Sequence, residues 1–179
     1  MTPEEMKRLQ DAHVASETNK DIEAAMATYH DDCYYHNVTL GFRVEGKDQI
    51  RDFYQNGWDT FPDGVVTIEG EAFGDNVAVH WGTFRAHASD TLFGQSADDI
   101  GLDPAGQGVS VEFPVIAVLT FKDGLVHAEH LLFDLATVCD SAPLTVDQVR
   151  AVAATSPYPK FEQAWGDRKP YRAPSTKDA

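Results

Sequence analysis

The sequence predicts an α+β domain in which helices come first and antiparallel strands follow. Helical patterns with capping signals fill the first third of the chain. The remainder holds two pairs of strand patterns, joined by short turns at Gly74-Asp75-Asn76 and Asp123-Gly124. Asp-Gly between two apolar runs is a strong signal for a two-residue hairpin. Segregated helices and antiparallel strands form α+β domains. A strongly curved sheet with helices across its concave face would enclose a pocket.

Local signals give the order of elements. Thr2-Pro3-Glu4-Glu5 is a capping box that starts a helix reaching about Ser16. Further elements are expected in this order: a helix over 21–29, a short strand over 33–38, a helix over 46–57, strands over 65–71 and 77–87, and a hairpin over 111–138. Thr145 and Gln148 form a second capping box, which opens a helix to about Ala154.

These elements divide the chain into one domain over residues 1–142 and a C-terminal helix with an irregular tail over 143–179. The segment 89–108 is a long loop rich in Gly and Asp. Loops of that length in compact domains are usually functional or disordered. The sequence leaves open whether this loop closes over the pocket as a lid.

The Asp123-Gly124 turn predicts a register for the last hairpin, in which Lys122 lies opposite Leu125. Because side chains alternate between the faces of a strand, one face would carry two sets of residues: Val111, Phe113, Val115, Ala117, Leu119 and Phe121, and Val126, Ala128, His130, Leu132, Asp134 and Ala136. That face is apolar except for His130 and Asp134. A carboxylate there would lose solvation and its pKa would rise, which makes Asp134 a candidate acid or base. The alternative is that Asp134 ends the strand and caps a nearby backbone.

His130 is the second candidate on this face, although a strand histidine is often a satisfied core residue. Four strand residues span roughly 13 Å, so His130 and Asp134 would contact different parts of one ligand. Phe113, opposite Asp134, would line the same face. Asn37 would donate a hydrogen bond to a carbonyl oxygen or form an Asx-type turn before Gly41.

Five other residues are candidates for binding a substrate. Tyr34 and His36 share one face of their strand, and the sequence does not determine whether it is the inner one. Trp81 would be core or pocket wall, with the core favoured. Arg85 and His87 lie on one side of their strand beside the long loop, where they would bind an oxyanion or be a solvated strand end.

Composition restricts the partners. The net charge of −15 over 179 residues argues against nucleic acid and anionic membranes. No apolar run approaches the length of a membrane helix, and no signal peptide is evident. Cys33 and Cys139 form no metal-ligand spacing. A disulfide stays open, but a reduced cytoplasmic protein is favoured.

We expect neither a metal nor a cofactor. The seven histidines include no chelating pair on one helix, and neither a phosphate loop nor a nicotinamide fingerprint occurs. The outer face of the hairpin would carry Ile116, Val118, Leu131, Phe133 and Leu135. That face is too apolar to meet water uncovered. We therefore expect a homodimer through the outer face of the sheet, or cover by the C-terminal helix.

Several motifs over residues 8–142 occur in the order found in one family. They are Tyr29-His30-Asp31-Asp32-Cys33-Tyr34-Tyr35-His36-Asn37, Gly46 with Ile50 and Phe53, Pro62-Asp63, Gly74-Asp75-Asn76-Val77-Ala78-Val79-His80-Trp81, His87, and Asp123-Gly124 ending in Asp134. In this order the chain resembles the SnoaL-like polyketide cyclases of the nuclear transport factor 2-like superfamily. The resemblance implies a cone-shaped α+β fold, and in these cyclases an Asp of the last strand is the acid/base, a position that matches Asp134.

The chain departs from the family in two places. The usual Trp of the last strand is His130, and the usual Gly-Thr-His is Arg85-Ala86-His87. Ketosteroid isomerase has the same fold, but its general base falls on Asn37 and its oxyanion-hole residues fall on His13 and Ala117. The resemblance therefore implies no steroid isomerisation by that chemistry.

The expected function is a cofactor-free enzyme acting on a hydrophobic, carbonyl-bearing small molecule by proton transfer from a pocket carboxylate. Cyclisation, isomerisation, dehydration and hydrolysis all fit this description. The alternatives are a protein that binds an apolar metabolite without turnover and a dimeric interaction domain.

Overall fold

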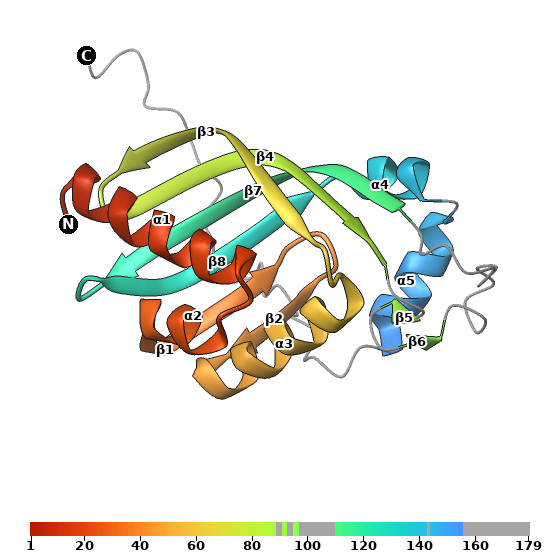
Figure 1. The fold of residues 1–179 in the computed structure, drawn as a ribbon, viewed down its shortest axis with the longest axis horizontal. Coiled ribbons are helices and arrows are strands. Elements are labelled where there is room, and N and C mark those ends of the chain that lie inside the picture. The colour runs from red at the N-terminus through yellow and green to blue at the C-terminus, as the bar shows by residue number, and fades with distance from the viewer. Residues whose placement is uncertain (89–90, 93–94, 97–109, 143, 156–179) are drawn as a thin grey trace, which may run out of the picture.

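The computed structural model describes residues 1–88, 91–92, 95–96, 110–142 and 144–155. Its elements are α1 (Pro3–Thr18), α2 (Ile22–Thr28), β1 (Tyr29–Asn37), β2 (Phe42–Glu45), α3 (Gly46–Thr60), β3 (Val65–Gly74), β4 (Val77–His87), β5 (Thr91–Leu92), β6 (Gln95–Ser96), β7 (Ser110–Lys122), β8 (Leu125–Phe133), α4 (Leu135–Ser141) and α5 (Val146–Thr155). Figure 1 shows α1, α2 and α3 across one face of a curved sheet, with α4 and α5 at one end of it. The predicted α+β architecture is confirmed.

The main sheet has six strands in the order β2-β1-β8-β7-β4-β3. Neighbouring strands are antiparallel except for β1 and β8, which pair in parallel. Four elements are additions to the prediction, and two of them, β5 and β6, pair within the segment that was expected to be a loop. β2 forms a hairpin with β1, and α4 begins at Leu135, where the sequence pattern predicted that the last strand continues. The segment 89–108, for which the sequence left the role of a lid open, falls largely outside the described residues, and the tail 156–179 lies entirely outside them.

Both predicted capping boxes are present. The Thr2 hydroxyl accepts from the Glu5 backbone N–H, and the Glu5 carboxylate accepts from the Thr2 backbone N–H. Thr145 and Gln148 make the same reciprocal pair at α5. These bonds satisfy backbone donors that a helix N-terminus otherwise leaves unpaired. A well-defined start therefore orients α1, which buries four residues against the sheet: Met6, Gln10, His13 and Ser16.

A β-bulge corrects the predicted register of the last hairpin. Lys122 faces Leu125 and Phe121 faces Val126, as expected, but the register shifts after Phe121, so that Leu119 faces Glu129. A shift of one residue moves every following side chain to the other face. Glu129, Leu131 and Phe133 consequently lie on the concave face, while Ala128, His130 and Leu132 lie on the convex face. The β7 residues expected on the inner face do lie there.

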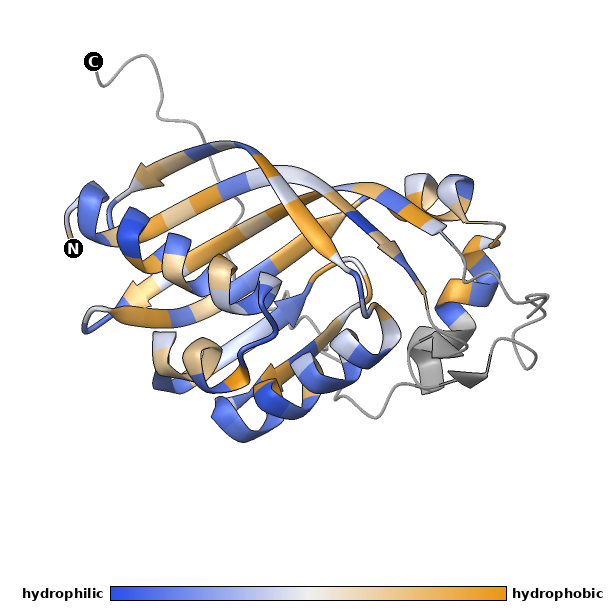
Figure 2. Ribbon diagram, viewed as in Figure 1, coloured by the Kyte–Doolittle hydropathy of each residue, from blue (hydrophilic) through white to orange (hydrophobic). Residues whose placement is uncertain are grey.

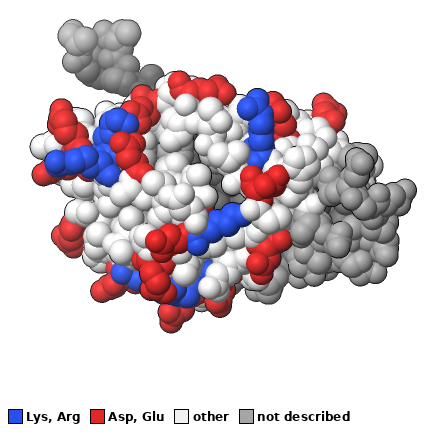
Figure 3. Space-filling view, in the orientation of Figure 1, with Lys and Arg blue, Asp and Glu red and all other residues white. Residues whose placement is uncertain are grey.

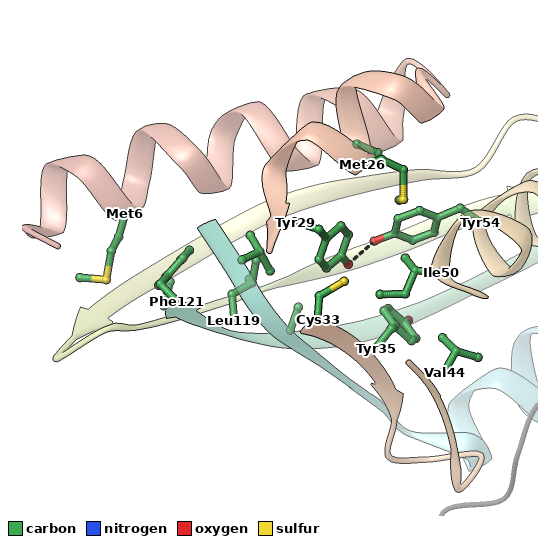
Figure 4. Packing of buried hydrophobic residues seen from close by; sticks show 14 of the residues in the cluster. Met6, Met26, Tyr29, Cys33, Tyr35, Val44, Ile50, Tyr54, Leu119 and Phe121 are labelled. Atoms are coloured by element: carbon green, nitrogen blue, oxygen red, sulfur yellow. Dashed lines mark hydrogen bonds between the residues drawn. The ribbon is translucent and has the colours of Figure 1, made fainter. Parts of the chain in front are cut away.

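Two hydrophobic clusters fill different parts of the concave face. The larger one lies under α1, α2 and α3 and includes Met6, Tyr29, Ile50, Tyr54 and Leu119 (Figure 4). The second lies towards α4 and α5 and includes Val111, Leu144 and Val149. Figure 2 shows hydrophobic residues along the sheet and hydrophilic ones along the outward sides of the helices.

Between these clusters the inward-facing side chains remain partly exposed. They are Val66, Ile68, Phe84, Phe113, Leu131 and Phe133. The space-filling view in Figure 3 shows a hollow near the middle of this face, with basic as well as acidic side chains beside it. The concave face is therefore an apolar cleft with a filled core on either side.

Candidate functional site

Glu129 is the carboxylate that enters the concave face. The bulge in the last hairpin turns it inward, and it is 5% exposed. Three groups converge on its Oε2 atom: the Tyr29 hydroxyl at 2.8 Å, the Tyr54 hydroxyl at 3.0 Å and His13 Nε2 at 3.3 Å. Figure 4 shows Tyr29 and Tyr54 pointing towards each other from β1 and α3, with their hydroxyls 2.8 Å apart. Helices and strands thus assemble one buried polar cluster inside the apolar core.

His13 is held in a fixed orientation by its other nitrogen. Its Nδ1 lies 2.8 Å from the Thr28 hydroxyl, and that hydroxyl donates to the backbone carbonyl of Ala25. Thr28 has one hydroxyl hydrogen, so it must accept from Nδ1–H. His13 Nε2 then points at Glu129 and Glu17, 3.3 Å from an oxygen of each.

Charge decides the protonation state of His13. Burial lowers its pKa, but the charge of Glu17 and hydrogen bonds to Glu129 and Glu17 outweigh burial and raise the pKa to about 10. At neutral pH His13 is therefore an imidazolium that donates through both nitrogens. Among the described residues, the ligand atoms of His13, Glu17 and Glu129 form the one group of three whose members lie within 4.8 Å of one another.

The same charge keeps Glu129 ionised. Burial raises the pKa of Glu129, but the hydrogen bond and charge of His13 and the hydrogen bond from Tyr29 outweigh burial and lower it. Burial and the charge of Glu129 raise the pKa of Tyr29 and of Tyr54, so both phenols keep their protons. All the bonds above go to Oε2. The Oε1 atom has no partner among the described residues, and it is not one of their fully enclosed polar atoms. Oε1 therefore faces open space.

His80 is a second polar group on the concave face. It lies on β4 opposite Ala117 and is 6% exposed. Burial lowers its pKa, against the opposing charge of Glu129, so His80 is neutral near pH 7. Its Nδ1 atom has no hydrogen-bond partner within the described part of the chain. An unpaired buried polar atom destabilises the fold by about 1–3 kcal/mol, and a ligand that pairs with it would recover this energy.

A row of aromatic rings lines the apolar part of the cleft. Phe61, Phe84, Phe113 and Phe133 follow one another with ring centroids 5.4, 5.2 and 5.2 Å apart. Each is partly exposed. Trp58 stacks on Tyr54 with its ring centroid 5.6 Å away, and it is also partly exposed. The cleft thus joins an aromatic wall to a charged end.

Asp134 does not lie in this cleft. It is exposed and is the N-cap of α4, where its carboxylate accepts from the Ala136 backbone N–H at 3.1 Å and the Thr137 hydroxyl at 2.8 Å. These bonds lower its pKa, so the expected rise is wrong. Asp134 therefore caps a nearby backbone, which was the alternative that the sequence left open. The apolar surroundings on which its role as acid/base depended are absent.

Three further candidates lie on the convex face. His130 and His36 approach each other with their Nδ1 atoms 3.3 Å apart, and the Tyr34 hydroxyl lies 3.4 Å from His130 Nε2. The expectation that His130 faces the pocket is wrong because the bulge reverses its face. Tyr34 and His36 lie on the same convex face, because β1 pairs with β8 so that Tyr34 is opposite Ala128 and His36 is opposite His130.

The candidates on β4 also point away from the cleft. Trp81 is 43% exposed on the convex face, so the expectation of core or pocket wall is wrong. Its ring covers Gly70, where an added Cβ atom would lie 2.1 Å from the ring. Arg85 pairs with Glu112 through two bonds of 2.9 and 3.1 Å, and His87 pairs with Asp63 at 2.6 Å. Both side chains are exposed, which agrees with the alternative expectation that they form a solvated strand end.

Asn37 and Phe113 remain on the inner side of the sheet. The Asn37 side chain accepts from the Leu40 backbone N–H at 3.0 Å, which is the Asx-type turn that the sequence allowed. Phe113 contributes to the aromatic row. The sequence did not single out Glu129, Glu17, Tyr54 or His80 as functional. The available signal was Glu129 itself, a carboxylate within an apolar strand pattern.

A family model described as a SnoaL-like domain matches residues 11–129. No curated protein matches the chain. A proposed SnoaL-like polyketide cyclase from Shewanella denitrificans OS-217 aligns with a TM-score of 0.66 at 18% identity, covering 78% of this chain and 97% of its own. An LEH-like epoxide hydrolase from M. tuberculosis aligns with a TM-score of 0.60 at 18% identity, covering 78% of this chain and 90% of its own.

A third similar structure is AclR from Streptomyces galilaeus, a proposed hydroxylase. It aligns with a TM-score of 0.62 at 17% identity and covers 78% of this chain and 96% of its own. Identities this low establish the fold alone, and the named activities of these three proteins differ. No described helix has the length and apolar character that a membrane crossing requires.

Proposed function

The chain belongs to the SnoaL-like family, and from this premise we propose that it is an enzyme whose general acid/base is Glu129. One observation carries the proposal. His13, Tyr29 and Tyr54 all lie within hydrogen-bond distance of Glu129 Oε2, while Oε1 has no partner among the described residues and is not fully enclosed. The first oxygen anchors the carboxylate, and the second is the atom that exchanges a proton with a substrate. A base held by its surroundings in one orientation transfers protons efficiently.

His80 supplies the second half of the reaction. When Glu129 takes a proton from a carbon next to a carbonyl, negative charge develops on the carbonyl oxygen. Neutral His80 would carry its hydrogen on Nδ1, and a side-chain movement that exposes this enclosed atom to the cleft would let it donate to that oxygen and stabilise it. Nδ1 is the atom without a partner among the described residues. When the product is released, protonated Glu129 returns the proton to the substrate skeleton or to a leaving group.

The lowered pKa of Glu129 restricts the substrate class. A weak base removes a proton only from an acidic carbon, because proton transfer depends on the difference between the two pKa values. The substrate's C–H group is therefore flanked by a carbonyl and by a second activating group. The Phe61, Phe84, Phe113 and Phe133 row favours a flat, apolar skeleton around that carbon.

Hydrogen–deuterium exchange of a model ketone tests this proposal. The C1 protons of 2-tetralone are activated by a carbonyl and an aromatic ring, and their loss in D2O is followed by proton NMR. The wild-type protein accelerates the exchange, Glu129→Gln lowers the rate by about 10²–10⁴-fold, and Asp134→Asn leaves it unchanged. Glu129→Gln with wild-type activity contradicts the assignment. A wild-type protein without acceleration contradicts the proposed substrate class.

A second candidate is a protein that binds an apolar metabolite without turnover. The depth of the cluster favours it, because Tyr29 and His13 are 0% and 1% exposed. The same variants separate the two functions. Binding without turnover predicts that wild type and Glu129→Gln bind 2-tetralone alike and that neither accelerates the exchange.

A further inference from the structure

We propose that His13, Glu17 and Glu129 form a binding site for a divalent metal ion of the size and ligand preference of Zn²⁺. The inference is independent of the proposed function, because the site would use Oε2 of Glu129 and leave Oε1 to the cleft. His13 and Glu17 are four residues apart and lie on one face of α1, and Glu129 comes from β8. The sequence alone does not bring these side chains together.

The distances between ligand atoms fit four-coordinate geometry. His13 Nε2 lies 3.3 Å from Glu17 Oε1 and 3.3 Å from Glu129 Oε2. Zn²⁺ binds imidazole nitrogen and carboxylate oxygen at about 2.0–2.2 Å, and the edge of a tetrahedron with such bonds is roughly 3.3–3.5 Å long. A metal ion placed between the three atoms therefore needs only small side-chain movements.

The groups around the three side chains resemble those that support metal ligands. His13 donates its other N–H to Thr28, whose own hydrogen is used by a backbone carbonyl. The Glu129 oxygen that would bind the metal also receives the Tyr29 hydroxyl. Such outer bonds orient ligands and increase metal affinity. The side chain of Glu17 is 26% exposed, which provides a path of entry.

Gln10 provides an independent indication of a ligand. It precedes His13 by three residues on the buried face of α1 and is 0% exposed. Its amide nitrogen donates to Glu71, but its Oε1 atom has no partner among the described residues. A buried acceptor without a partner requires an explanation such as a water or an ion. A water or an ion bound beside Gln10 would satisfy it.

The charge balance of the three side chains also favours a divalent ion. Two carboxylates face each other across one imidazole, and a single imidazolium leaves the cluster with a net negative charge. A divalent ion bound to a neutral imidazole and two carboxylates gives a neutral cluster, and buried charges are favourable only when they are balanced. Imidazole combined with carboxylate ligands suits Zn²⁺ and Co²⁺ better than Ca²⁺ or Mg²⁺.

Titration of the chelator-treated, full-length protein with Co²⁺ tests the proposal. Visible absorption reports four-coordinate Co²⁺, and calorimetry with Zn²⁺ gives the stoichiometry. We expect one ion per chain. Glu17→Gln should lower the affinity by at least about tenfold. The matched control is Asp63→Asn, which removes the carboxylate of the exposed His87–Asp63 pair at the surface and should leave binding unchanged.

Two results would overturn the inference. One is a wild-type protein that binds neither ion at one equivalent, and the other is binding that Glu17→Gln leaves intact. Circular dichroism confirms that Glu17→Gln is folded, and the partial exposure of Glu17 makes a folded variant the expected case. Because the readout is metal binding, failure here leaves the exchange test of Glu129 unaffected.

Discussion

Adjacent residues of β8, Glu129 and His130, belong to two clusters on opposite faces of the sheet. Both clusters contain histidine and tyrosine. On the concave face, burial lowers the pKa of His13 but two carboxylates outweigh burial and raise it to about 10. On the convex face, burial, assisted by the charge of Arg43, lowers the pKa of both His36 and His130.

Acidic neighbours explain the difference. His13 has an oxygen of Glu17 and one of Glu129 at 3.3 Å, whereas His36 and His130 lie against each other and near Arg43, whose guanidinium stacks 3.6 Å above the Tyr34 ring. The same residue types therefore have opposite charge states on the two sides of one strand. The concave cluster is a fixed ion pair at the edge of a cleft, and the convex cluster is a neutral aromatic surface.

The largest expected effect is on stability. Glu129→Ala removes the carboxylate that accepts from the Tyr29 hydroxyl and one of the two carboxylates beside the buried His13 imidazolium, and we expect a loss of about 3–5 kcal/mol. His130→Ala removes a half-buried ring from the convex face and should cost about 1 kcal/mol. Urea unfolding of both variants measures the difference. Equal losses would mean that the two clusters are energetically equivalent. If Glu129→Ala does not fold, Glu129→Gln supplies the comparison.

The two clusters should change the stability of the protein with pH in opposite directions, because their histidine pKa values are shifted in opposite directions. The folded pKa of His13 is raised, so its contribution to stability is complete below pH 6.5 and is lost as the pH rises towards about 10. The pKa values of His36 and His130 are lowered, so the unfolded chain binds protons more readily and stability falls as the pH drops below 6.5.

Urea unfolding between pH 5 and pH 10 tests these two slopes. His13→Gln should remove the alkaline loss of stability and leave the acid side as in the wild type. His130→Ala should weaken the acid loss and leave the alkaline side unchanged. An alkaline slope that persists in His13→Gln would show that another group titrates there.

A smaller expected effect concerns association. Trp81 and Ile116 are paired across β4 and β7 and are 43% and 45% exposed on the convex face. We predict a homodimer through this face, and a charge at Ile116→Glu should weaken it by about 2 kcal/mol or more. Size-exclusion chromatography with light scattering measures the mass, with Gln55→Glu on the exposed side of α3 as the control. A monomeric wild type would contradict the prediction.

The sequence predicted the fold because its signals are local. The capping box at Thr2, the alternation along β7 and the Asp123-Gly124 turn each act within a few residues, and each is present. The site was mispredicted because one bulge lies between that turn and Glu129. No local signal identifies the extra residue in β8, and its presence exchanges the inner and outer faces.

The carboxylate that is buried in the concave face belongs to Glu129 and not to Asp134. Asp is one of the residue types favoured at a helix N-cap. In the structure the hydroxyl of Thr137, three residues later, donates to the Asp134 carboxylate. The Tyr54 hydroxyl meets Glu17 and Glu129 only through tertiary packing of α1 and α3 on β8. Contacts of that kind depend on the fold and are not evident in a single sequence.

One measurement compares the two faces directly. The methyl group of Ile68 faces the cleft from β3, and that of Ile116 faces outward from β7. In protein with labelled isoleucine methyl groups, assigned with Ile68→Val and Ile116→Val, titration with 2-tetralone should shift the Ile68 signal and leave the Ile116 signal in place. A shift of Ile116 without one at Ile68 would place the ligand on the convex face and contradict a functional site built around Glu129.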